Sequence, residues 1–189
     1  MFWWKVQGRW NLMQFHNKPP LRRMIILGLL IAIALVLSYF ERFIPLSFAV
    51  PGIKLGLANI VTLLAINLYR PKDVYLLVVL RVILASIFIG SMMSLWYSMA
   101  GGLLSATGML LMSSLPKDKV SIVGISVVGA ICHNIGQIII VSIITGSAYV
   151  AMTYFPILVV AAVVAGIFIG YVAKATKPYL ARIVLDHNS

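Results

Sequence analysis

The sequence predicts an all-α integral membrane protein with six transmembrane helices. Of its 189 residues, 62% are hydrophobic and only 10% are charged. A soluble domain carries roughly 25% charged residues, so this chain lacks the polar surface that would keep it dissolved. The formal charge of +11 comes from fifteen basic and four acidic residues, which are separated by long apolar runs. Because no solvated basic face is expected, we predict no binding to nucleic acid.

Six apolar runs approach the length of a membrane-spanning helix, which is about 20 residues. Unpaired backbone groups are costly in lipid, so each run is expected to be helical. In chain order, the predicted spans are Met24–Phe40, Gly52–Tyr69, Val74–Ile89, Met92–Met112, Val120–Ile144 and Val150–Ala173.

The first three spans differ in how many polar residues interrupt them. The first is uninterrupted and ends before Glu41. The second is the least regular, because Lys54, Asn59 and Asn67 lie within it. The third carries Arg81 near its middle.

The last three spans have longer apolar stretches. The fourth is rich in Gly, Ser and Met, and the fifth contains the consecutive residues Cys132, His133 and Asn134, followed by Gln137. The sixth has Pro156 in its first turns, where a missing backbone donor costs little.

The distribution of basic residues predicts that both termini are cytoplasmic. Twelve of the fifteen lie in the N-terminal segment, after the second and fourth spans, and at the C-terminus. The opposite side carries only Arg42 and Lys54, and cytoplasmic loops are the ones that retain Lys and Arg. We therefore expect a basic and aromatic interfacial segment over 1–23, a transmembrane domain over 24–173 and a basic tail over 174–189, in a bacterial cytoplasmic membrane.

Arg81 is the most informative polar residue within the spans. It lies eight residues after Asp73, or about 12 Å along a helix, which places it near the middle of the bilayer. Exposure to lipid there costs roughly 2.5–3.5 kcal/mol, so the side chain should face the bundle. No acidic partner is evident, because Glu41 is expected at the outer end of the first span. The guanidinium is therefore expected either to cap backbone carbonyls or to bind an anionic ligand group.

The fifth span places Gly129, His133, Gly136 and Gln137 on one helical face, because their offsets are 4, 7 and 8 residues. This face is typical of close helix packing, or alternatively of a surface that hydrogen-bonds a ligand. Asn134 lies about 100° away. One histidine without a second ligand residue at suitable spacing makes no metal site, and no cofactor is predicted.

Other polar and small residues leave two interpretations open. Lys54 and Asn59 would point into the outer half of the bundle, while Trp96 would belong to an interfacial aromatic belt or stack on a ligand. Small residues four apart, as at Gly28 and Ala32 or at Gly166 and Gly170, are typical of helix-packing seams. Their spacing does not say whether the neighbour is internal or another protein.

Three stretches give the chain a resemblance to a known family. They are PGIKLGLANIVT over Pro51–Thr62, the segment Ser94–Ser105, and GAICHNIGQ over Gly129–Gln137. They resemble the Gx transporter family, also labelled heptaprenyl diphosphate synthase component I. That family is similar to the substrate-binding S components of energy-coupling factor (ECF) transporters, which implies a six-helix bundle with an outward pocket for a small molecule.

The resemblance also implies partners. A transmembrane coupling subunit of ECF type and ATPase subunits would join the chain in the lipid bilayer, and small residues of the first span would form the docking surface: Gly28, Ala32 and Ala34. Burial cost and helical phase, rather than the family, suggest the candidate substrate-binding residues: Lys54, Asn59, Arg81, Trp96, His133, Asn134 and Gln137.

Catalysis by this chain alone is not expected, despite the enzyme named in the family label. Elongating a prenyl diphosphate requires carboxylates that hold Mg²⁺ against the pyrophosphate, and none of the four acidic residues is adjacent to another. The leading hypothesis is the substrate-binding subunit of an importer, with an anionic, vitamin-like or isoprenoid-like ligand. The alternative is a non-catalytic membrane component or scaffold of heptaprenyl diphosphate or quinone biosynthesis, or of a redox assembly.

Overall fold

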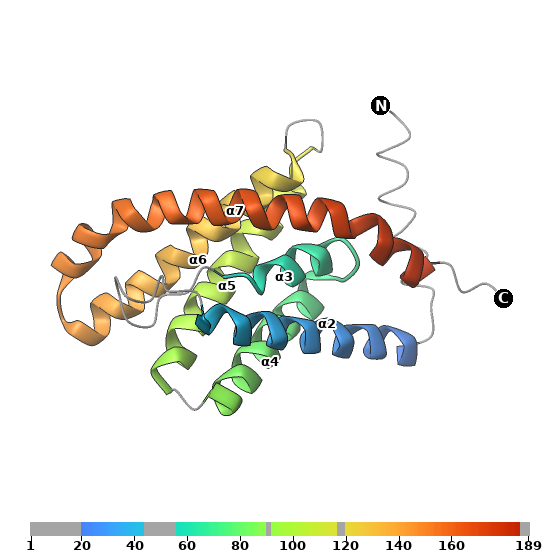
Figure 1. Cartoon of the computed structure of the whole chain (residues 1–189), viewed down its shortest axis with the longest axis horizontal. Coiled ribbons are helices and arrows are strands. Elements are labelled where there is room, and N and C mark those ends of the chain that lie inside the picture. Colours follow the sequence, from blue (N-terminus) through green and yellow to red (C-terminus); the bar gives the residue numbers. More distant parts are fainter. Residues whose placement is uncertain (1–19, 44–55, 90–91, 117–119, 186–189) are drawn as a thin grey trace.

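The structure, a computed structural model, describes residues 20–43, 56–89, 92–116 and 120–185. Every regular element in these ranges is helical, which confirms the predicted all-α class (Figure 1). The elements are α2 (Pro20–Phe40), the short 3₁₀ helix η1 (Glu41–Phe43), α3 (Asn59–Ile66), α4 (Pro71–Ile89), α5 (Met92–Ser114), α6 (Ile122–Thr145) and α7 (Ala148–Leu185).

Four of the described helices are long and apolar enough to cross a membrane, so the chain is a multi-pass membrane protein. They are α2, α5, α6 and the part of α7 from Met152 to Leu180. The 19-residue helix α4 is not one of these four, because it carries three charged residues: Lys72, Asp73 and Arg81. Helix α7 has 38 residues and continues to Leu185, well past the predicted end of the sixth span.

Helix α3 is much shorter than the predicted second span. It has eight residues, about 12 Å of helix, whereas the bilayer core is about 30 Å thick. The interruption lies at Gly56, whose φ of +79° is left-handed and incompatible with a continuous helix. Residues 57 and 58 form a turn, and the helix begins only at Asn59.

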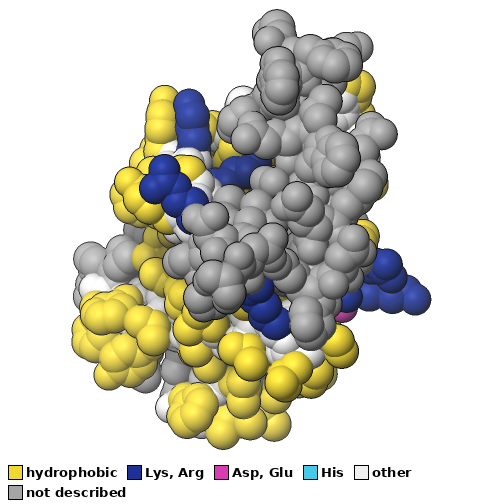
Figure 2. All heavy atoms as spheres, turned by 90° about the vertical axis from the view of Figure 1, so that its right-hand side faces the viewer, with side chains coloured by type: hydrophobic (Ala, Val, Ile, Leu, Met, Phe, Trp, Pro, Cys, Tyr) yellow, Lys and Arg dark blue, Asp and Glu magenta, His cyan; other side chains and the backbone are white. Residues whose placement is uncertain are grey.

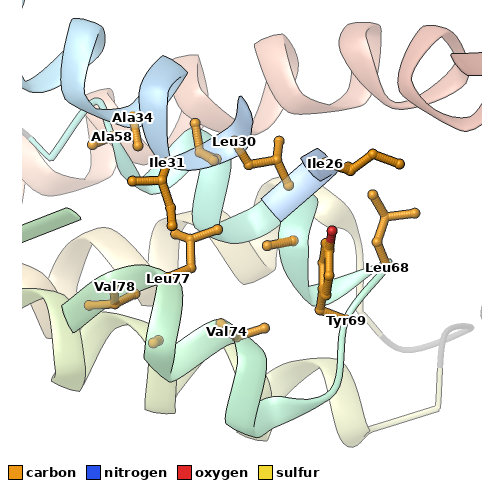
Figure 3. Close-up of a cluster of buried hydrophobic side chains, with 13 residues drawn as sticks. Ile26, Leu30, Ile31, Ala34, Ala58, Leu68, Tyr69, Val74, Leu77 and Val78 are labelled. Carbon is orange, nitrogen blue, oxygen red and sulfur yellow. The ribbon is translucent and has the colours of Figure 1, made fainter. Parts of the chain in front are cut away.

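This short helix is the centre of the bundle. It packs against α2, α4, α5, α6 and α7, and Figure 1 shows it between α2 and α7. All of its residues from Asn59 to Ala65 are buried. One apolar cluster joins α3 to α2 and α4, and Figure 3 shows Ile31 of α2 facing Leu77 of α4.

Close backbone contacts join α6 to its two neighbours. A Cβ added to Gly136 would lie 2.6 Å from the carbonyl oxygen of Ala100 on α5. On the other side, a Cβ at Gly166 of α7 would lie 2.6 Å from Cα of Val127. The small residues of the last span therefore form a seam within this chain, which settles the alternative left open by their spacing.

Basic side chains gather at one end of the bundle, where α2 begins and α7 ends (Figures 1 and 2). Arg23 forms an ion pair of 3.5 Å with Asp73 of α4. Lys177 donates a 3.1 Å hydrogen bond to Oδ1 of Asn67, and the hydroxyl of Tyr69 donates to the carbonyl oxygen of Arg23. These contacts fix the two ends of the described chain against the turn between α3 and α4; the predicted cytoplasmic position of this end stays a prediction.

Candidate functional site

The start of α3 is stabilised by a carboxylate from a different segment. Glu41 of η1 is only 6% exposed, and its Oε1 accepts hydrogen bonds from the backbone N–H of Gly56 and, at 3.4 Å, from that of Leu57. Gly56 and Leu57 lie in the turn that precedes α3, whose own first N–H groups donate to the carbonyl oxygens of Gly56, Leu57 and Ala58. The carboxylate therefore satisfies two buried or part-buried N–H groups of this turn. Glu41 thus links the end of α2 to the turn that precedes α3 by hydrogen bonds.

Arg81 lies in the same region, on α4. Its side chain is 4% exposed, and Nη2 would be 3.3 Å from a Cβ built on Gly102 of α5. The carboxylate of Glu41 is near enough to act electrostatically on the guanidinium. Glu41, which the sequence placed at the outer end of the first span, is thus a buried acidic residue in the same region as Arg81.

His133 of α6 lies between two glycines. A Cβ on Gly101 would be 2.9 Å from its Nδ1, and a Cβ on Gly56 would be 3.4 Å from its Nε2. Nε2 of the ring also pairs with Nε2 of Gln137 at 3.1 Å, one helical turn away. The close approach of the imidazole to α5 and to the start of α3 thus requires glycine at both positions.

Asn59 completes the group. It is 1% exposed, and its Nδ2 would lie 2.7 Å from a Cβ on Gly56. Neither Nδ2 nor Oδ1 has a hydrogen-bond partner among the described residues. We call Glu41, Asn59, Arg81, His133 and Gln137 the buried polar cluster.

Further buried groups without a partner lie nearby in sequence on the same elements. Thr62 lies one turn after Asn59, and Ser105 lies one turn after Gly101. Both hydroxyls are fully buried, and neither they nor Nε of Arg81 have a hydrogen bond within the described ranges. Leaving a buried polar group unpaired costs about 1–3 kcal/mol. Such a concentration indicates polar atoms that a bound molecule or water would satisfy.

Three of the predicted candidates do not join the cluster within the described ranges. Trp96 is 57% exposed on the outside of α5, which fits the aromatic-belt alternative. Asn134 is buried but faces α7, where its Nδ2 donates a 2.9 Å hydrogen bond to the carbonyl oxygen of Leu158. Lys54 lies outside the described residues.

The predicted docking residues divide in the same way. Gly28 and Ala32 are exposed on the outer face of α2, and a Cβ on Gly28 would have nothing within 4 Å. Ala34 is fully buried in the apolar cluster between α2, α3 and α4. Only the first two can therefore contact another molecule.

Two residues of this region are absent from the candidates that the sequence suggests. Glu41 is expected at the outer end of the first span, and its position at the end of an uninterrupted apolar run is the available indication of burial. Thr62 lies three residues after Asn59, an offset that places both on one helical face.

We expect Gly56→Ala to disturb this site directly. Alanine would have to adopt the left-handed φ of Gly56, and backbone strain of this kind costs of order 1–3 kcal/mol. Its Cβ would also lie 2.7 Å from Asn59 Nδ2. Thermal unfolding of the purified protein should show a lower midpoint. Gly28→Ala is the matched control and should leave the midpoint unchanged or slightly raised, and equal midpoints for the two variants would contradict the left-handed turn.

The residues present do not suggest a metal centre. Within the described ranges, no group of three or more His, Cys, Asp or Glu residues is positioned to hold a metal ion. The cluster instead contains amide, guanidinium, imidazole and carboxylate groups, which are hydrogen-bonding groups.

Comparison with known proteins identifies the family. No curated protein and no solved structure matches the chain. The family model described as heptaprenyl diphosphate synthase component I matches residues 30–176, a range that includes every member of the buried polar cluster. Because this match covers more than half of the chain, the protein belongs to the heptaprenyl diphosphate synthase component I family.

Proposed function

We propose that the chain is the substrate-binding membrane subunit of a small-molecule importer in the bacterial cytoplasmic membrane, and that the buried polar cluster binds the polar part of the substrate. The observation that carries this proposal is Asn59. Its carboxamide is 1% exposed with both polar atoms unpartnered, at a helix break where Glu41, Arg81 and His133 also converge. If Asn59 served packing alone, an apolar residue of similar volume would stabilise the protein equally well or better, because a buried amide without partners costs free energy.

The same proposal assigns the partners. An importer needs an energy source, and this chain has no phosphate-binding Gly-rich loop, so ATP hydrolysis falls to separate ATPase subunits through a transmembrane coupling subunit of the ECF type. Gly28 and Ala32, exposed on α2 with open space around Gly28, are the proposed contact with that coupling subunit, because small residues allow helices to approach closely in lipid.

Mass spectrometry of the molecules retained by the purified full chain tests substrate binding. We expect Asn59→Leu to lose the retained molecule while its thermal midpoint stays equal or rises, because no hydrogen bond is removed. Asn134→Leu is the matched control: it removes the bond to Leu158, so its midpoint should fall while the molecule is retained. If wild type and Asn59→Leu retain the same molecules, or wild type retains none alone or with coupling subunits, the proposal fails.

A second function is favoured by the family description itself. As a non-catalytic membrane component, the chain would hold a soluble prenyl synthase subunit at the bilayer, and its polar cluster would only fix the packing of α3. In that case Arg81→Ala and His133→Ala would lower folded yield but leave recruitment of the soluble subunit intact in a pull-down. Loss of uptake by the same variants at normal expression would instead favour the importer.

A further inference from the structure

The carboxylate of Glu41 occupies a position built for an anion. Two backbone N–H groups of the turn before α3 donate to it. The guanidinium of Arg81 is buried beside Gly102, the neighbour of Gly101, and the ring of His133 lies against both Gly101 and Gly56. Convergent backbone N–H donors and a buried arginine are the usual components of a carboxylate or phosphate site. Here the anion belongs to the chain itself, from an element fifteen residues before Gly56.

This position has donors that Glu41 does not use. Nδ2 of Asn59 and Nε of Arg81 are both buried N–H donors that have no hydrogen-bond partner in the part of the chain that the structure describes. Asn59 is 1% exposed, and its Nδ2 is directed to the same glycine whose N–H binds Glu41. A ligand with its own carboxylate and a neighbouring polar group would satisfy donors that one tethered carboxylate leaves unsatisfied.

We propose that Glu41 occupies the place of the substrate's carboxylate, and that a small organic carboxylate binds at the start of α3 by displacing the Glu41 side chain. This inference rests on the proposed substrate-binding function and names the substrate class. Displacement, rather than joint binding, follows from charge: two carboxylates beside one guanidinium repel each other, whereas either one alone balances Arg81. Glu41 lies in the single turn of η1 at the end of α2 and not within a long helix.

Chemical rescue by acetate tests the proposal on the full chain in detergent. Glu41→Ala removes the internal anion and leaves the donors in place, so sodium acetate should raise its thermal midpoint by a saturating amount of about 2–4 °C or more. Sodium chloride at equal ionic strength should not. Wild type should respond much less, because its own carboxylate competes as an intramolecular ligand.

Two further variants keep the test decisive. Adding Arg81→Met to Glu41→Ala should abolish the acetate response. If Glu41→Ala does not accumulate, the acetate-dependent shift in thermal midpoint is measured for Glu41→Gln with and without Arg81→Met. A neutral amide competes weakly with an anion, so the same two results are expected. Equal acetate and chloride shifts, or a shift that survives the loss of Arg81, would overturn the anion position.

The outcome is separable from that of the proposed function. Rescue by acetate without any retained native molecule would support the anion position and count against the importer. A retained native molecule without acetate rescue would support substrate binding and overturn the displacement of Glu41.

Discussion

Gly136→Ala is expected to lower the yield of folded protein severely and to reduce the thermal midpoint of what remains. The added Cβ would lie 2.6 Å from the carbonyl oxygen of Ala100 and 2.7 Å from Cα of Gly101. Both contacts are with backbone, so no side-chain rotation relieves them and α5 must move away from α6. Overpacking of this kind costs about 1–3 kcal/mol, occasionally more, and fluorescence-detected size exclusion of a tagged chain in detergent measures the effect.

Moving α5 would also displace the site. Gly101, which is adjacent to Ala100, packs against the ring of His133, and Gly102 packs against the guanidinium of Arg81. The proper control is Gly124→Ala in the same helix, where the nearest atom, Oγ of Ser121, would be 3.4 Å from the new Cβ. Because alanine favours helix over glycine by up to about 1 kcal/mol, this control should be neutral or stabilising. A Gly136→Ala protein as stable as the control would disprove the close contact between α5 and α6.

Helical phase predicted the part of the site that lies within one helix. The offsets of His133, Gly136 and Gln137 placed them on one face of a helix. The structure places all three in the interior, and the side chains of His133 and Gln137 form a hydrogen bond. Burial cost likewise predicted that Arg81 faces the bundle, and it is 4% exposed. Such inferences succeed because a single regular helix fixes the relative directions of its own side chains.

The parts that sequence reasoning missed depend on contacts between elements. The interaction of Glu41 with the start of α3 requires the chain to turn back between residues 41 and 56, and hydropathy says nothing of such a turn. Hydropathy also predicts Gly52–Tyr69 as a single span, because apolar residues lie on both sides of Gly56. The left-handed conformation of Gly56 interrupts a helix at this point, and one glycine in an apolar run does not reveal its φ.

Glu41→Gln and Arg81→Met are expected to destabilise the protein unequally. Removing one partner of a buried pair of opposite charges costs about 3–5 kcal/mol, because the other charge is left uncompensated. Glu41→Gln should approach that figure, since it leaves the guanidinium without its carboxylate. Arg81→Met should cost less free energy of unfolding, because the carboxylate of Glu41 keeps its hydrogen bonds from the N–H groups of Gly56 and Leu57.

The double variant shows whether the two residues act as a pair. With both charges removed no unbalanced charge remains in the core, so Glu41→Gln with Arg81→Met should be more stable than the sum of the single effects predicts, by about 0.5–3 kcal/mol. Reversible denaturation of the four proteins in the same detergent gives this coupling energy. Strictly additive effects would mean that another group neutralises the charge of Arg81. The carboxylate of Glu41 would then serve only to accept the N–H groups of Gly56 and Leu57. A positive coupling energy would instead establish that the break at Gly56 holds a carboxylate and a guanidinium together within the membrane-spanning bundle, which is the arrangement that the proposed exchange with a substrate carboxylate requires.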